Sequence, residues 1–136
     1  LHHSNHKKGV TINTGTTDIT ISDIKIHYYY TINGEVSQNF WCDWSGIGSS
    51  NVLGQFVKLA TLVTGADYYL EITFTSEAGT LRPGQSAEVQ ARFAKSDWTN
   101  YNQSDDYSFN ASSNQYVTSD KITGYIGDTL VFGVQP

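Results

Sequence analysis

Polar and hydrophobic residues alternate with a period of two along most of the chain. In the stretch IKIHYYY, Ile24 and Ile26 alternate with Lys25, as in a strand that buries one face. Further β-prone runs follow at regular intervals: GQFVKLA (54–60), DYYLEITFT (67–75), SAEVQARFA (86–94), SNQYVTSDKITGYIG (113–127) and TLVFGV (129–134). No stretch keeps a helical period, so the pattern predicts strands throughout.

Turn residues separate these runs. Asn33 and Gly34 lie between two β-prone runs, a pattern that predicts a hairpin, and RPGQ at 82–85 predicts a turn. No repeat or low-complexity linker divides the chain. Many short strands with turns between them predict one all-β domain over residues 1–136, an antiparallel two-sheet β-sandwich.

The alternation also assigns side chains to faces. We expect His27 and Tyr29 to share one face of their strand, and Tyr69 and Glu71 to share a face opposite to Leu70. One outer surface would then carry Tyr, His and Glu side chains. Such a surface fits either a hydrated sheet face or a ligand groove, because Tyr and His are amphipathic.

Composition narrows the classes of partner. The net charge is −5 and the pI is near 5.1, with no stripe of Lys and Arg, which argues against nucleic acid as a partner. Few charges and many Tyr, Thr, Ser and Asn residues favour a secreted, β-rich domain. The single cysteine, Cys42, excludes an intrachain disulfide and is expected to be a small buried hydrophobic residue rather than a reactive thiol.

The chain shows no targeting or membrane segment. No apolar run approaches the roughly 18 residues that span a bilayer, so we expect no membrane contact. No signal peptide is recognised, and we expect a mature protein or one module of a longer chain. Residues 1–8, LHHSNHKK, are expected to be a remnant of cloning or a frayed, atypical N-terminus rather than a metal site.

Catalytic patterns are absent from the sequence. There is no G-x-S-x-G motif, and His27 has no assignable nucleophile. The carboxylates cannot be paired as the acid and nucleophile of a glycosidase, and zinc-ligand spacing is missing. We therefore expect a protein that is not an enzyme.

Binding of a sugar surface is better supported. The stretch RFAKSDWTNYNQSDDYSF (92–109) holds Trp98 among polar residues, and WCDW ends with Asp43 and Trp44. Sugar rings stack on aromatic rings, and a planar Arg–carboxylate pair can extend such a platform. A flat, insoluble polysaccharide would favour aromatic residues aligned at one surface. For each tryptophan, a place in the core is the alternative.

Two polar stretches could hold calcium. NQSDD (102–106) and TIN (31–33) supply carboxylate, amide and carbonyl oxygens, which are the ligands that Ca²⁺ prefers. Asp105 and Asp106 would point to opposite faces of a regular strand, so both could bind one ion only from an irregular loop. An ordinary polar turn is the alternative.

Seven segments together resemble the family 3 carbohydrate-binding modules, the cellulose-binding modules of cellulosomal scaffoldins and cellulases. They are NTGTTDI, IHYYYTINGE, NFWCDW, GQFVKL, YLEITFT, LRPGQSAEVQARFAKSDWTNYNQSDDYSF and GYIGDTLVFG. They run in order from Asn13 almost to the C-terminus. The resemblance implies a jelly-roll topology, a bound structural calcium ion and a flat strip that binds cellulose.

The resemblance also implies three sets of site residues. The cellulose-binding strip would use Trp98, Arg92 and an ion-paired Asp43, with Trp44 beside it and Gln90 and Ser113 as polar anchors. Calcium would be held by Thr31, Asn33, Asn102, Asp105 and Asp106. A shallow groove on the other sheet would be lined by His27, Tyr29, Tyr69, Glu71 and Tyr107.

The sequence departs from the family at several of these positions. Trp44 stands where strip-binding members commonly have His, and it could enlarge the platform. The loop SGIGSSNVLG lacks the family's Tyr, so one stacking ring is expected to be missing. His27 stands where the groove usually has Arg. Asn33 replaces a carboxylate and Asp105 replaces an amide, so the ligand charge stays similar and we expect the calcium site to survive.

The resemblance leads to one function and two alternatives. We expect non-catalytic binding to crystalline cellulose by a monomeric module of a larger, extracellular bacterial protein. The first alternative, an ancillary module of a family 9 glycoside hydrolase, is disfavoured because such modules typically lose the strip that Trp98, Arg92 and Asp43 represent here. The second alternative is the polysaccharide-sensing ectodomain of an anti-sigma factor.

Overall fold

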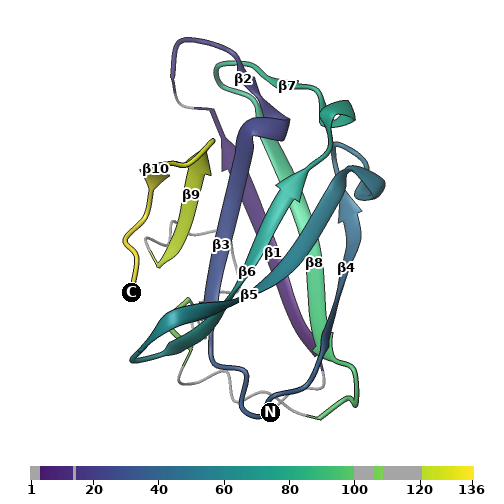
Figure 1. Ribbon diagram of the computed structural model, residues 1–136. Helices are drawn as coiled ribbons and strands as arrows, with labels where there is room; N and C mark the ends of the chain where they lie inside the picture. Colours follow the sequence, from purple (N-terminus) through teal and green to yellow (C-terminus); the bar gives the residue numbers. More distant parts are fainter. Residues whose placement is uncertain (1–3, 14, 100–105, 109–120) are drawn as a thin grey trace.

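Two antiparallel sheets pack face to face in a β-sandwich with jelly-roll topology, which confirms the predicted fold class (Figure 1). The computed structural model describes residues 4–13, 15–99, 106–108 and 121–136, and for residues 4–12 it describes the backbone alone. In these residues the helical segments are short 3-10 turns, and none is long or apolar enough to cross a membrane.

The strands form three antiparallel groups. The first sheet has the order β1 (Ser4–Ile12), β8 (Ser86–Lys95) and β4 (Gln38–Ser45). The second has the order β10 (Thr129–Phe132), β9 (Ile122–Ile126), β3 (Ile24–Tyr30), β6 (Ala66–Phe74) and β5 (Val52–Val63). A short ribbon joins β2 (Ile19–Thr20) to β7 (Thr80–Leu81), and the 3-10 turns are η1 (Ile21–Asp23), η2 (Ser49–Asn51) and η3 (Ser76–Ala78).

Aromatic side chains fill the space between the two sheets. Phe93 of β8 is fully buried, and its ring centroid lies 4.9 Å from that of Tyr30 and 5.8 Å from that of Phe56. Tyr28 belongs to the same core cluster, whereas His27 and Tyr29 point to the other face of β3. The face assignment made from the alternation is therefore confirmed, and burial of these large rings is a main source of stability.

The predicted hairpin at Asn33 and Gly34 is wrong. Both residues do have the positive φ angles, 57° and 118°, that a tight turn requires. The strands on either side nevertheless pair elsewhere: β3 lies between β6 and β9, and β4 pairs with β8 in the other sheet. The turn therefore carries the chain across the sandwich, because the buried faces of β3 and β4 belong to opposite layers of the core.

The N-terminal segment differs from the frayed end that we expected for residues 1–8. Residues from Ser4 onward form β1, which pairs along its whole length with β8, with Ser4 opposite Ala94 and Ile12 opposite Ser86. Every residue except proline carries the backbone N–H and C=O groups that pair strands, and residues 4–12 contain no proline, so this atypical sequence can still form a strand. The chain thus has a first strand ahead of NTGTTDI.

Gly54 marks a close approach between β5 and β4. It pairs with the inward-facing Ile72, and a Cβ atom at residue 54 would overlap the ring of Phe40. Gly54→Ala should therefore lower the free energy of unfolding by about 1–3 kcal/mol, the usual cost of overpacking. Urea unfolding followed by fluorescence measures this change.

Gly124→Ala is the matched control. Its added Cβ would lie 3.6 Å from Cβ of Phe132, an ordinary van der Waals contact, so its stability should equal or exceed that of wild type. Equal stability of Gly54→Ala and Gly124→Ala would contradict the packing of Phe40 against β5.

Candidate functional site

A β-bulge shapes the outer face of β4. The register between β4 and β8 shifts between Cys42 and Trp44, which leaves Asp43 as the extra residue. In a regular strand, Asp43 and Trp44 would point to opposite faces. Here both are exposed, with Trp44 at 50%, while Ser45 is buried. The bulge thus places a carboxylate and an indole ring together on the outer surface.

Strand β8 adds a row of polar side chains beside the bulge. The Nε atom of Arg92 lies 2.9 Å from Oδ1 of Asp43, which confirms the expected ion pair. Gln90 lies two residues before Arg92, on the same face, and its Nε2 donates to Oε2 of Glu88 at 2.7 Å. Glu88, which the sequence analysis did not select, therefore fixes the orientation of the Gln90 amide.

Trp98 projects from the turn that follows β8. Its side chain is 49% exposed and its φ angle is 59°, a left-handed conformation that is rare for a bulky residue. The Trp98 amide donates to the carbonyl of Lys95 at 3.0 Å. Asp97 accepts hydrogen bonds from the Thr99 hydroxyl and amide, and these bonds lower the pKa of Asp97. Hydrogen bonds thus hold the backbone on both sides of an exposed indole.

Trp41 is a member of this group that the sequence analysis missed. Its ring lies nearly parallel to that of Trp98, with an angle of 11° and a centroid separation of 5.8 Å. The guanidinium carbon of Arg92 lies 4.4 Å from the Trp41 ring centroid. The alternation in WCDW could have identified it, because residues 41 and 43 of one strand share a face.

We call this group the strip; it consists of Trp41, Asp43, Trp44, Gln90, Arg92 and Trp98. The structure brings the described members of the expected cellulose-binding set together on one sheet and its adjoining turn. Ser113 lies outside the described residues. Because a flat sugar surface favours aligned rings, we predict that the rings of Trp44 and Trp98 are roughly coplanar.

The expected calcium ligands that the structure describes also lie together. Oδ1 of Asp106, which is 6% exposed, accepts from the amide and hydroxyl of Thr31 at 2.8 and 2.9 Å. Nδ2 of Asn33 donates to the Thr31 hydroxyl at 3.2 Å. Asn102 and Asp105 lie outside the described residues. The group offers carboxylate, hydroxyl and amide oxygens, a donor set that fits calcium.

Lys95 joins this group to the strip. Its Nζ donates to the carbonyl of Asn33 at 2.7 Å, and its own carbonyl accepts from Trp98. The side chain is buried, and burial lowers the pKa of Lys95. One residue therefore anchors both the loop after β3 and the turn that presents Trp98.

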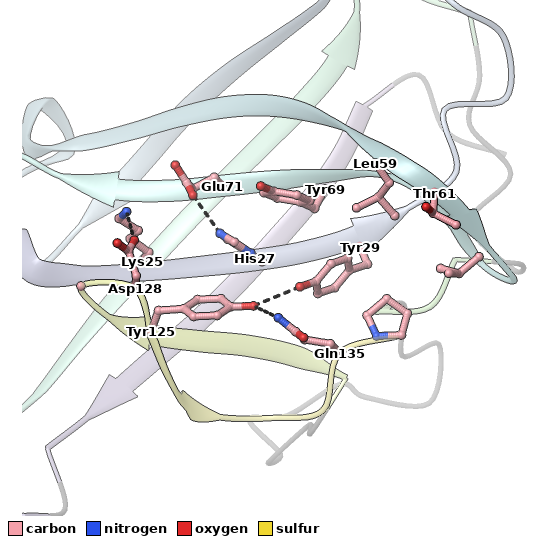
Figure 2. A pocket seen from close by; sticks show the side chains of 13 residues that line it. Lys25, His27, Tyr29, Leu59, Thr61, Tyr69, Glu71, Tyr125, Asp128 and Gln135 are labelled. Carbon is pink, nitrogen blue, oxygen red and sulfur yellow. Dashed lines mark hydrogen bonds and ion pairs between the residues drawn. The ribbon is translucent and has the colours of Figure 1, made fainter.

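A groove of about 450 Å³ lies on the outer face of the five-stranded sheet (Figure 2). Four of the five expected residues line it: His27, Tyr29, Tyr69 and Glu71. Tyr107 is not among the lining residues, because its ring packs edge-on against Tyr29 and its hydroxyl donates to the carbonyl of Val134 at 2.6 Å. The sequence analysis missed several lining residues, among them Lys25, Tyr125, Asp128 and Gln135.

The groups in the groove are tightly paired. Nε2 of His27 lies 2.8 Å from Oε2 of Glu71, and its ring stacks on Tyr69 with a centroid separation of 4.2 Å. Burial lowers the pKa of His27, and the hydrogen bond to Glu71 opposes this effect only in part. The hydroxyls of Tyr29 and Tyr125 lie 3.1 Å apart, and Gln135 donates to Tyr125 (Figure 2). Neutral His27 is therefore the form that the folded groove favours.

The chain is similar to known proteins along nearly its whole length. The family model of the cellulose binding domain, family 3, matches residues 5–133. The chain belongs to this family. The family 3b module of the scaffoldin subunit ScaA from Acetivibrio cellulolyticus is 55% identical, with a TM-score of 0.97 over 99% of this chain and 88% of that chain.

Two curated relatives are much longer than this chain. Exoglucanase-2 of Thermoclostridium stercorarium is 59% identical over 91% of this chain, and the match spans 14% of that protein. Anti-sigma-I factor RsgI4 of Acetivibrio thermocellus is 53% identical over 92% of this chain, and that match spans 24% of its length. The chain thus corresponds to one carbohydrate-binding module of multimodular proteins.

The lowered pKa of His27 predicts a loss of stability in acid. The unfolded chain, in which His titrates near 6.5, binds a proton more readily than the folded groove. The contribution of neutral His27 to the free energy of unfolding is therefore fully present above about pH 6.5. It is lost as the pH falls from there through the lower pKa of His27 in the folded state. Urea unfolding at pH 8 and pH 5.5 should show a smaller pH effect in His27→Gln than in wild type.

Glu71→Gln is the second variant in this comparison. It removes the negative charge that favours charged His27, so the loss of stability in acid should become larger than in wild type. The pH dependence of the double variant His27→Gln/Glu71→Gln gives the titration of the other groups, which is subtracted from both. An identical pH dependence in wild type and His27→Gln would contradict the assignment.

Proposed function

We propose that this module binds crystalline cellulose through the strip and catalyses no reaction on it. The observation that supports this proposal most is Trp98, a large apolar ring held half exposed on an unfavourable left-handed backbone. Strain of this kind persists only where the surrounding structure imposes it, and it concentrates at functional sites. The ring of a packed core residue would need no such arrangement.

The neighbours of Trp98 suit a flat sugar surface. Trp44 is equally exposed, and Arg92, bonded to Asp43 through Nε, presents a planar guanidinium with further hydrogen-bond donors. Gln90 adds an amide in the same row. Aromatic faces would contact the C–H faces of glucose rings, and the polar groups would bond the hydroxyls of adjacent chains.

Replacement of Trp98 tests the proposal. Covering one indole face removes about 100 Å² from water, or about 2–3 kcal/mol before the costs of ordering and desolvation. Trp98→Ala should therefore weaken binding by about 1–2 kcal/mol, or roughly ten- to thirtyfold. The measurement is depletion of the protein from solution by microcrystalline cellulose.

Phe132→Ala is the matched control, because Phe132 is 46% exposed but lies on β10 of the other sheet. It should bind as wild type does. Wild type that stays in the supernatant, or a folded Trp98→Ala that binds as tightly as wild type, would rule out the strip as the cellulose-binding surface.

We also propose that the module is a monomeric part of a longer bacterial protein that works outside the cell. The match spans only a small part of Exoglucanase-2, which supports a multimodular protein as the source of this module. The similarity to RsgI4 favours a second role, a polysaccharide-sensing module of an anti-sigma factor. Both roles use the same strip, so the domains that flank the module in its gene decide between them.

A structural calcium ion is the remaining part of the proposal. Thr31, Asn33 and Asp106 would hold it together with Asn102 and Asp105. When bound, the ion would cross-link the loop after β3 to the segment that contains Asp106. The contacts between Thr31 and Asp106 support this placement.

Calcium that binds only the folded state should stabilise it by about 2.7 kcal/mol at a hundredfold excess over Kd. Thermal unfolding of wild type should therefore give a higher midpoint with calcium than with a chelator. Asp106→Asn should lose most of this difference. The matched control, Asp128→Asn, removes a fully exposed carboxylate and should keep it. An unchanged midpoint in wild type freed of metal would contradict the calcium site.

A further inference from the structure

Trp41 contacts two groups of the strip at once. In the β4–β8 pair it stands directly opposite Arg92, whose guanidinium carbon lies 4.4 Å from the Trp41 ring centroid. On the ring of Trp98 it makes an offset stack, at 5.8 Å and 11°. Trp41 itself is only partly exposed. It therefore lies between the ion pair and the exposed ring as a shared support.

Both supported groups would have more freedom without this ring. Trp98 sits in a turn, and its backbone conformation is one that a bulky residue disfavours. Arg92 has a long side chain, and a single contact between its Nε and Asp43 leaves the plane of the guanidinium free to tilt. Stacking on an aromatic face restricts that tilt, because the guanidinium is planar.

We propose that Trp41 is the positioning residue of the strip: it fixes the planes of the Trp98 ring and the Arg92 guanidinium before cellulose is bound. This inference rests on the proposed function, because it names how the strip is held ready. A group that is already ordered loses less conformational freedom on binding, so preorganisation raises affinity without a new contact. Trp41 acts through Trp98 and Arg92 rather than through cellulose.

The first test measures the order of Trp98 without any ligand. The chain has three tryptophans, so the indole ¹⁵N–¹H signals can be assigned by single Trp→Phe variants. The heteronuclear NOE of the Trp98 indole, which reports motion on the ps–ns timescale, should be high in wild type and lower in Trp41→Leu. Trp41→Phe keeps an aromatic ring at residue 41, so the NOE of the Trp98 indole should stay close to its wild-type value.

The second test measures binding to microcrystalline cellulose by depletion. Trp41→Leu should weaken binding by about three- to tenfold, the worth of one aromatic stack, and Trp41→Phe by less. In a Trp98→Ala background the same Leu substitution should cost about twofold or less, because one positioned group is gone. Circular dichroism and thermal unfolding establish that each variant is folded at the assay temperature.

The outcomes separate this inference from the proposed function. If the Trp98 NOE is unchanged in Trp41→Leu, the inference is overturned whatever the binding results are. If the loss of binding is as large in the Trp98→Ala background as in wild type, Trp41 acts independently and the inference is again overturned. If wild type fails to bind cellulose while the NOE still depends on Trp41, the proposed function falls and the positioning contact stands.

Discussion

Burial of Phe93 between the two sheets is the constraint on which the strip depends. This side chain has no exposed surface and packs against rings from β3 and β5. Successive residues of a strand point to opposite faces, so burying Phe93 sends Arg92 to the outside. A slip of one residue would bury the guanidinium and expose the phenyl ring. The hydrophobic core thus sets the register that places Arg92 opposite Trp41.

The bulge at Asp43 then supplies what a regular strand cannot. Regular alternation would expose Asp43 and bury Trp44, which would remove the second indole from the surface. The extra residue allows both to face outward while Ser45 still turns inward. Bulges often redirect side chains in this way next to functional sites. The strip therefore combines a regular strand, β8, with an irregular one, β4.

The sequence predicted the features that follow from alternation and failed where distant pairing decides. The faces of β3 and β6 could be read directly, because Tyr28, Tyr30 and Leu70 point into the core, whereas Tyr29 and Tyr69 alternate with them and line the groove. The turn at Asn33 was recognised, but its hairpin was wrong, since local turn chemistry does not say which strands pair across the sandwich. Alternation in WCDW places Trp41 on the same face as Asp43, but it does not show what Trp41 does there. Its role comes from Arg92 and Trp98, which are about fifty residues away along the chain.

The two outer faces of the sandwich differ in how their aromatic rings are used. In the groove, the hydroxyl of Tyr29 is bonded within a network, and its side chain is 4% exposed. A flat polymer face could cover little of such a ring. On the strip, Trp44 and Trp98 each leave about half of their surface in contact with water. Between the groove and the strip, the strip therefore offers more aromatic surface that binding can remove from water, which is why contact with an extended surface is assigned to that side.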